Sequence, residues 1–408
     1  MRKPISPRAA LASVCAASVL LGATACAADA PESGEDGPIT IGASLPLTGE
    51  FSQGGLDTQQ GYEVWVELQN EGGGLLGRDV EILVKDDATN QNTVVTNYNT
   101  LVDQDGVDLL LGTQSSLLNI PASAVAERAG MLYVCPSCAS PDMFNRGFEY
   151  IFFSQQATAS TQAETFAEWV ADLPADERPA TAAYPSLDDP FASPVVEGVR
   201  ETLEAAGIET VYADVYPATT KNFDAIVGAI RDSGAELVVQ GAQFEDGVNF
   251  VRAMNRAGFA PELLYQSSSP TYGEQYLEGV GPENAQGVFF SSSYHVAAET
   301  EGNAEFVAKY DEMFGGLPPE DAADGFAAAQ VVAAAVEAVG GYDDQAALAD
   351  WLRSNSVETI LGTLRWNEDG SPDGQFLVGQ WQDGVSDVVL PADVATTDRI
   401  LRWRGDAL

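Results

Sequence analysis

The chain has 408 residues, of which 61 are acidic and 19 are lysine or arginine, so its formal net charge is −42. This charge argues against binding to nucleic acid or to an anionic lipid surface, because both need a cluster of basic residues. With this length and 45% hydrophobic residues, we expect two domains, each with its own core.

The first 25 residues have the pattern of a secretory signal: a basic start, then an apolar run of small residues that ends in "ATAC". This ending resembles a bacterial lipobox, which predicts cleavage before Cys26 and attachment of a lipid to it. Cleavage near Ala25 or Ala28 without a lipid is the alternative. We therefore expect an extracytoplasmic protein that contacts the cell membrane only through its N-terminal lipid.

The segment 26–38 is acidic and rich in small residues, proline and glycine, and we expect a disordered tether there. Beyond the signal, no segment approaches the roughly 20 uninterrupted apolar residues that a membrane helix needs.

From Ile39 onward, short apolar runs alternate with segments of helical spacing. "ITIGASLPL", "VEILVKD", "VDLLLG" and "MLYV" are expected strands, and a helix is expected over 119–128. The same alternation resumes after Thr158, where "ATAAY", "IETVYADVY", "AELVVQG" and "ELLYQ" are the expected strands. Such alternation predicts βαβ units and parallel sheets. The expected fold class is α/β, with two doubly wound lobes and more than one chain crossing between them.

The last hundred residues contain a different pattern. "DGFAAAQVVAAAVEAVGG" predicts a helix apolar enough to be buried in the core. "ETILGTLRWNEDG" and "GQFLVGQW" predict two strands joined by a turn at Asn367–Gly370.

Several of these segments together resemble a known family. "ITIGASLPLTGEFSQGG", "GTQSS", "PSCASPDMFNRGFEYIFF" and "NSVETILGTLRWNEDGSPDGQFLVGQW" look like the branched-chain amino acid type of extracytoplasmic solute-binding protein that serves ABC importers. The resemblance covers roughly residues 39–385. It implies a periplasmic-binding-protein-like fold of type I, in which two Rossmann-like lobes joined by three crossings close on a ligand.

The resemblance also implies the domain limits and partners. Lobe 1 is expected at 39–156 plus 290–361, and lobe 2 at 157–289 plus 362–400. The expected partners are a small-molecule ligand and an ABC permease in the membrane. We expect a monomer without a cofactor or a metal.

A serine loop follows the strand that ends at Gly112. Ser115 and Ser116 can offer hydroxyl groups, and the adjacent backbone N–H groups open a helix and suit an anion. Simple N-capping of that helix is the alternative. In the family this loop holds the carboxylate of the ligand, and the matching hydroxyl falls on Ser116.

The motif "CPSCASP" occupies the next loop. Its cysteines, Cys135 and Cys138, suit a redox pair, half of a metal site or a disulfide. A structural zinc needs two further ligands, whereas His295 is the only histidine in the chain. A thioredoxin-like pair normally opens a helix, whereas Pro141 follows here. In an exported protein we therefore expect a small disulfide that stiffens the loop.

The resemblance gives this loop and four other regions a role in binding, and the sequence departs from the family there. In the loop, the carbonyl and hydroxyl groups that meet the ligand's ammonium fall on Ser137 and Ala139. An aromatic position falls on Gly54, and the acid that pairs with the ammonium falls near Ser268. The other matched or substitute positions are Phe191, Gln243, Phe244, Tyr272, Glu274 and Asp321.

These departures predict a ligand other than plain leucine, isoleucine or valine. It is either an amino acid whose ammonium meets Glu274 or Asp321, or an amide or carboxylate that lacks the ammonium. The expected function is therefore a transport receptor rather than an enzyme. A ligand-sensing receptor that uses the same clamp is the first alternative, and a thiol-disulfide oxidoreductase that uses Cys135 and Cys138 is the second.

Overall fold

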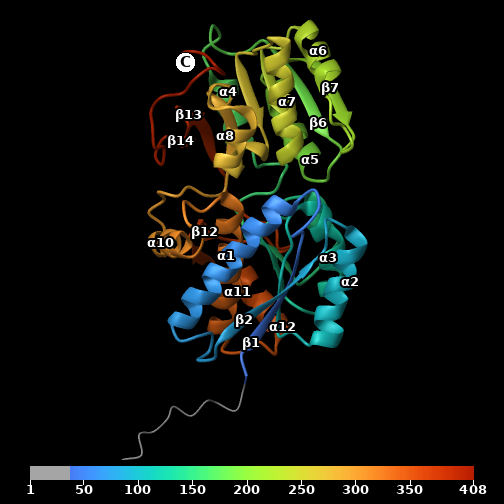
Figure 1. The fold of residues 1–408 in the computed structure, drawn as a ribbon, viewed down its shortest axis with the longest axis vertical. Helices are drawn as coiled ribbons and strands as arrows, with labels where there is room; N and C mark the ends of the chain where they lie inside the picture. The colour runs from blue at the N-terminus through green and yellow to red at the C-terminus, as the bar shows by residue number, and fades with distance from the viewer. Residues whose placement is uncertain (1–36) are drawn as a thin grey trace, which may run out of the picture. The chain divides into compact units, whose positions relative to one another are not determined.

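The computed structural model describes residues 37–408 (Figure 1). The predicted signal, the lipidation of Cys26 and nearly all of the predicted tether lie outside the described residues. Among the described residues, one helix, Glu320–Val339, is long and apolar enough to cross a membrane, but most of its residues are buried within the protein. It is the core helix that the alanine and valine pattern predicted.

The first lobe is built on a five-stranded parallel sheet of order β2-β1-β3-β4-β5. Its strands are β1 (Ile39–Leu45), β2 (Val80–Asp86), β3 (Leu109–Leu111), β4 (Tyr133–Cys135) and β5 (Ile151–Phe153). Leu109 and Leu111 face one side of the sheet and Leu110 faces the other, as the two-residue period of a strand requires. Because both faces are buried, the strands read as continuous apolar runs.

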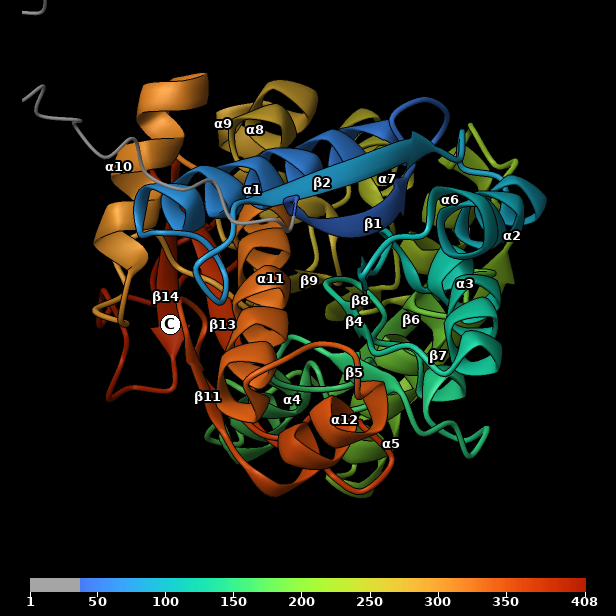
Figure 2. The same ribbon diagram turned by 90° about the horizontal axis from the view of Figure 1, so that it is seen from below.

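Helices cover both faces of this sheet (Figure 2). One face carries α1 (Ser52–Glu71), α10 (Asn303–Phe314), α11 (Glu320–Val339) and α12 (Gln345–Ser354). The other face carries α2 (Gln91–Thr100), its extension η1 (Leu101–Asp105) and α3 (Ser116–Ala129).

Helices α1 and α11 touch backbone to backbone, and glycines make this possible. A Cβ atom added at Gly61 would lie 1.9 Å from the carbonyl oxygen of Ala322, and one added at Gly325 would lie 2.7 Å from the carbonyl oxygen of Thr58. Any larger side chain at either position would force the helices apart. This contact fixes where the first turn of α11 lies.

The second lobe is built on a seven-stranded sheet of order β14-β13-β10-β9-β8-β6-β7. Five strands are parallel, and β13 and β14 add an antiparallel edge. The strands are β6 (Thr181–Leu187), β7 (Glu209–Tyr216), β8 (Leu237–Gln240), β9 (Leu263–Gln266), β10 (Val288–Ser292), β13 (Leu377–Gln382) and β14 (Val385–Leu390).

The helices of the second lobe again lie on both faces of their sheet. One face carries α4 (Glu164–Asp172) and α5 (Ala192–Ala205). The other carries α6 (Asp224–Ser233), α7 (Phe244–Ala257) and α8 (Glu274–Val280). Three short helices, η2 (Pro141–Met143), η3 (Ser269–Tyr272) and α9 (Pro282–Ala285), lie in the connections.

The prediction of two C-terminal strands joined by a turn at Asn367–Gly370 is confirmed for the turn, but the strands on its two sides lie in different sheets. Strands β11 (Val357–Thr359) and β12 (Gly362–Leu364) instead pair with each other, and β13 pairs with β10 and β14. The turn itself exists, but it packs against β5, where the indole N–H of Trp366 donates to the carbonyl of Phe153 at 2.7 Å. An isolated antiparallel bridge between Trp366 and Pro372 flanks the turn, and the chain then continues to β13 in the other lobe.

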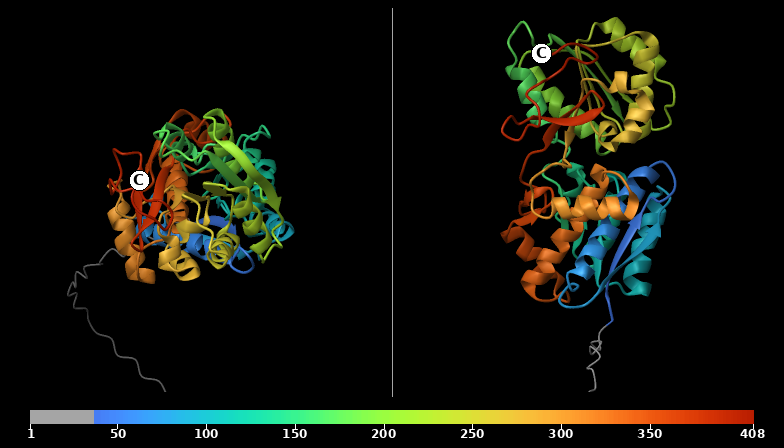
Figure 3. Two further views of the ribbon diagram at one scale, coloured as in Figure 1. Left: turned by 90° about the horizontal axis from the view of Figure 1, so that it is seen from above. Right: turned by 60° about the vertical axis from the view of Figure 1, so that its left-hand side comes forward.

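The chain passes between the lobes three times, through residues 154–163, 293–302 and 365–376 (Figure 3). The side-chain amide of Gln156 donates to the carbonyls of Ser293 at 2.8 Å and Leu361 at 3.0 Å, and so ties the crossing region together. The predicted fold class is confirmed. The lobe boundaries stay a prediction, and one of them, at 289/290, falls inside β10.

Candidate ligand-binding site

A cavity of about 50 Å³, measured as space open to the centre of a water molecule, lies where the carboxyl ends of strands from both sheets meet. The loops after β3 and β4 line it from the first lobe, and those after β8 and β9 line it from the second. This is the usual ligand position in open α/β sheets. The lining residues are Gln114, Ser115, Ser116, Ser137, Ala139, Phe153, Gln155, Gln162, Phe191, Gln243, Ser267, Ser268, Thr271, Glu320, Asp321, Asp324 and Phe376.

The loop between β3 and α3 presents polar atoms that have no partner in the described part of the chain. The Ser115 hydroxyl and the side-chain amide oxygen of Gln114 are buried, and neither makes a hydrogen bond within the described residues. Ser115 also has a φ of 71°, an unusual value for a residue with a side chain. Unsatisfied buried polar groups and backbone strain both concentrate at functional sites.

A buried amide holds this loop in place. The Asn119 amide donates to the carbonyls of Thr113 at 2.7 Å, Ser115 at 2.9 Å and Ser137 at 2.9 Å. Its own oxygen accepts from the Tyr133 hydroxyl at 2.6 Å. Asn119 therefore joins the serine loop to the cysteine loop. Its amide bonds to the Ser137 carbonyl, the group that the resemblance assigns to the ligand's ammonium.

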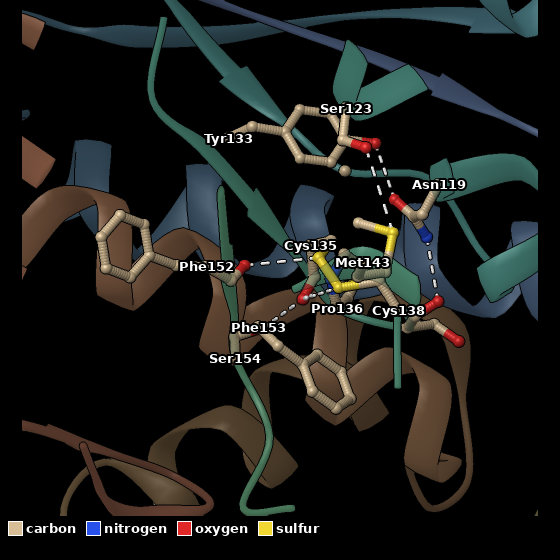
Figure 4. Close-up of a disulfide and its surroundings, with 12 residues drawn as sticks. Asn119, Ser123, Tyr133, Cys135, Pro136, Cys138, Met143, Phe152, Phe153 and Ser154 are labelled. Atoms are coloured by element: carbon tan, nitrogen blue, oxygen red, sulfur yellow. Dashed lines mark hydrogen bonds between the residues drawn. A yellow bond between two sulfur atoms is a disulfide. The ribbon is translucent and has the colours of Figure 1, made fainter. Parts of the chain in front are cut away.

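The predicted disulfide between Cys135 and Cys138 is present (Figure 4). Both cysteines are completely buried, which removes the access that a thiol-exchange site needs. The loop beyond them returns to the serine loop, where the Ser140 N–H donates to the Ser116 hydroxyl at 3.0 Å. The disulfide therefore supports a loop that lines the cavity.

Three carboxylates open helix α11 and line the opposite part of the cavity: Glu320, Asp321 and Asp324. Protein donors compensate two of them. The Ser292 hydroxyl donates to Glu320, while Ser293 and Gln155 donate to the two oxygens of Asp324 at 2.6 and 2.5 Å. Burial nevertheless raises the pKa of Glu320 to about 7 and holds that of Asp324 well above its ordinary range.

Asp321 is less well compensated. Burial raises its pKa well above the ordinary value, and the charges of Asp57 and Glu320 raise it further. The hydrogen bond from Tyr272 opposes this effect only in part. Asp57, behind it on α1, accepts from the Gln53 amide at 3.0 and 3.1 Å, and burial raises its pKa to about 6.

Gly54 brings the two halves of the site together. A Cβ atom added there would lie 2.8 Å from Asp321 Oδ2 and 2.8 Å from Gln114 Nε2. The family's aromatic side chain would therefore displace both groups. The carboxylate and the amide occupy the space that the missing ring leaves.

Eight of the eleven predicted site residues line the cavity: Ser115, Ser116, Ser137, Ala139, Phe191, Gln243, Ser268 and Asp321. Three do not. The tilted rings of Phe244 and Tyr272 have centroids 4.7 Å apart. Tyr272 donates a hydrogen bond to Asp321, which lines the cavity. Glu274 is exposed at the start of α8. That these residues bind a ligand stays a prediction.

Sequence reasoning missed several lining residues, of which Gln114, Gln155, Glu320 and Asp324 carry the strongest polar groups. One signal was available for the acids: Glu320, Asp321 and Asp324 lie in the first turns of a helix that is otherwise rich in alanine and valine. Carboxylates in the first turns of a buried helix indicate a functional site or a buried partner, because charged groups are rarely buried without one.

Comparison with proteins of known sequence gives consistent results. The chain is 29% identical to Leu/Ile/Val-binding protein homolog 3 of Brucella melitensis, a match that covers 85% of this chain and 92% of the relative. It is 27% identical to an amino acid binding protein of Pseudomonas aeruginosa, covering 85% and 90%.

Solved structures share the fold. The branched-chain amino acid transporter substrate-binding protein of Streptococcus pneumoniae, in complex with isoleucine, has a TM-score of 0.74 at 18% identity and covers 86% of this chain and 97% of its own. A solute-binding protein of an ABC transporter from R. palustris, in complex with benzoate, has a TM-score of 0.73 at 18% identity and covers 91% and 98%.

The family model described as periplasmic binding protein matches residues 38–385, which is most of the described chain. The chain therefore belongs to the periplasmic binding protein family.

Proposed function

We propose that the protein is the extracytoplasmic, lipid-anchored receptor of an ABC importer, which binds a small polar solute and delivers it to a membrane permease. The solute is an amino acid or a related amide or carboxylate. Family membership supports a solute-binding rather than an enzymatic role, in agreement with the sequence-based prediction. The names of the relatives support amino acids as the first class to test.

One observation carries the proposal. The cavity is lined from both lobes, and it contains buried polar atoms of Gln114 and Ser115 that no described residue satisfies. A ligand that bonds to these atoms gains hydrogen bonds without breaking any within the protein. Because three chain segments connect the lobes, such a ligand can hold them closed about the hinge.

A thermal-shift screen over amino acids, amides and small carboxylates tests the binding role. A solute that binds only the folded protein raises its melting temperature in a concentration-dependent way. Calorimetry should then give a stoichiometry of one. If no solute in the three classes shifts the melting temperature, the proposal is wrong.

The anchor has its own test. Mass spectrometry of the membrane-extracted protein should find a diacylglyceryl group on Cys26. An unmodified N-terminus at Ala27 or later would contradict the lipid anchor without affecting the binding role.

A further inference from the structure

The cavity carries a surplus of acidic over basic side chains. Glu320, Asp321 and Asp324 line it, and Asp57 lies behind Asp321. Among the described residues that line the cavity, none is a lysine, an arginine or a histidine. Burying uncompensated charge costs several kcal/mol per ion, so the site favours a ligand that supplies positive charge.

The surplus is concentrated at one position. Hydroxyl and amide donors satisfy Glu320, Asp324 and Asp57, as described above. Asp321 accepts a hydrogen bond from Tyr272, and it faces the charges of Asp57 on α1 and Glu320 on its own helix. A cation from the ligand would therefore bind at Asp321 first.

A second observation points to the same place. The side-chain oxygen of Gln114 is a buried acceptor without a donor among the described residues. The same side chain reaches the neighbourhood of Asp321, because Gln114 Nε2 and Asp321 Oδ2 each lie 2.8 Å from a Cβ atom added at Gly54. An acceptor of this kind needs an N–H or O–H group. An ammonium or guanidinium group can donate to the carboxylate and to the amide oxygen together.

The lining of the cavity suits an organic cation better than a metal ion. The described residues contain no group of three or more side chains with an arrangement that could hold a metal. Phe153, Phe191 and Phe376 line the same cavity and offer apolar surface for a short methylene chain.

Building on the proposed function, we propose that the solute is a small amine with a net positive charge, either a basic amino acid or a diamine. One cationic group binds at Asp321 and donates in addition to the unsatisfied oxygen of the neighbouring Gln114 side chain, and the methylene chain lies against the phenylalanine rings. A zwitterion with one ammonium and one carboxylate has no net charge, so it leaves the surplus of acidic groups in the site uncompensated.

Calorimetry with four solutes tests this inference on the intact protein: lysine, norleucine, cadaverine and benzoate. Lysine and norleucine have the same chain length and differ in the terminal ammonium, and cadaverine lacks the carboxylate. We expect lysine or cadaverine to bind at least about tenfold more tightly than norleucine, a difference of about 1.4 kcal/mol, because only they offer a second charged donor to the carboxylate. Lysine as the tightest ligand identifies a basic amino acid, and cadaverine identifies a diamine.

Two variants locate the effect. Asp321→Asn should weaken the cationic solute at least about tenfold and leave norleucine much less affected. Glu337→Gln is the matched control, because this acid is exposed at the far end of the same helix. If Asp321→Asn does not fold, as judged by circular dichroism, Gln114→Leu removes the paired acceptor and should show the same selectivity.

The outcomes separate the two proposals. If norleucine binds as tightly as lysine and cadaverine, or if benzoate is the only ligand, the inference about charge is wrong and the binding role stands. If neither these solutes nor those of the wider screen bind, both proposals are wrong.

Discussion

Two helices point their N-termini at the same cavity, and they use this position in opposite ways. Helix α3 begins with Ser115 and Ser116, which are neutral, and the positive end of the helix stays available to an acceptor group. Helix α11 begins with Glu320 and Asp321, so its own carboxylates occupy the positive end. The N-terminus of α3 favours an anion, whereas the N-terminus of α11 presents an acidic surface to the cavity.

The contrast shows that a helix N-terminus does not by itself decide which ligand charge it attracts. The partial charge of a helix end is about half an elementary charge. A single carboxylate in the first turn outweighs it, and α11 places three in or just after that turn. The selectivity of each half of the site therefore follows from its side chains.

The largest effect is expected for Asp321→Asn, which should raise the free energy of unfolding by about 1–4 kcal/mol at pH 7.5. Burial raises the pKa of Asp321 above its ordinary value of 3.8, so the folded protein holds this proton to higher pH than the unfolded chain does. The carboxyl group therefore destabilises the fold progressively as the pH rises above about 4.

Urea denaturation of the wild type and the variant at pH 4 and pH 7.5 measures this difference. The gain from Asp321→Asn should shrink towards zero at pH 4, and Glu337→Gln should stay within about 0.5 kcal/mol of the wild type at both pH values. A variant that is less stable than the wild type at pH 7.5 would show that Asp321 is compensated within the protein.

Ser293→Ala should have the opposite sign and a somewhat smaller size. It removes the hydroxyl that donates to Asp324 Oδ1 at 2.6 Å and strands a buried oxygen, which should cost about 1–3 kcal/mol of stability. A double-mutant cycle with Asp324→Asn isolates the pair. A coupling free energy near zero would mean that Asp324 does not depend on Ser293.

Replacement of both Cys135 and Cys138 by serine tests the support behind the α3 end of the cavity. Because the closed loop is short, its loss should cost at most about 2 kcal/mol of stability by the loop-entropy estimate, and the protein should still fold. Ligand affinity should fall, since the loop positions the Ser140 N–H that binds Ser116. Unchanged affinity would limit the disulfide to a role in stability.

Ser115→Ala should have the smallest effect on the fold and a selective effect on binding. Its hydroxyl has no hydrogen-bond partner within the described chain, so the free energy of unfolding should change little. Affinity for a solute with a carboxylate should fall by about 1 kcal/mol, whereas a diamine should be unaffected. Ser116→Ala is the comparison, because loss of its bond to the Ser140 N–H should lower stability as well.

Much of the fold was predictable because its signals are local. Short apolar runs separated by helix-length segments identified the parallel strands, and the loop after Gly112 identified Ser115 and Ser116. The C-x-x-C spacing, in an exported chain with one histidine, identified the disulfide. Each of these patterns spans few residues, and secondary structure and short-range geometry decide it.

The acidic half of the site was harder to predict because distant contacts create it. Glu274 follows the expected acid position by a few residues, yet α8 holds it at the surface. Asp321 reaches the cavity because α11 packs backbone to backbone on α1 at Gly61. The pairing of the strand after the turn at Asn367–Gly370 was missed for a similar reason, since β13 pairs with the distant strand β10. A single sequence does not show such pairings.

Proton release on ligand binding is the most direct test of the claim that the α11 carboxylates receive a cation. Burial raises the pKa of Glu320 to about 7, so this group holds a proton near pH 6, and burial raises the pKa of Asp321 well above its ordinary value. A bound ammonium group lowers the pKa values and displaces a proton. Calorimetry of lysine or cadaverine binding at pH 6, in two buffers of different ionisation enthalpy, counts the protons. We predict release of roughly one proton per ligand in the wild type and clearly fewer in Asp321→Asn. Equal binding enthalpies in the two buffers, or proton uptake, would contradict the account.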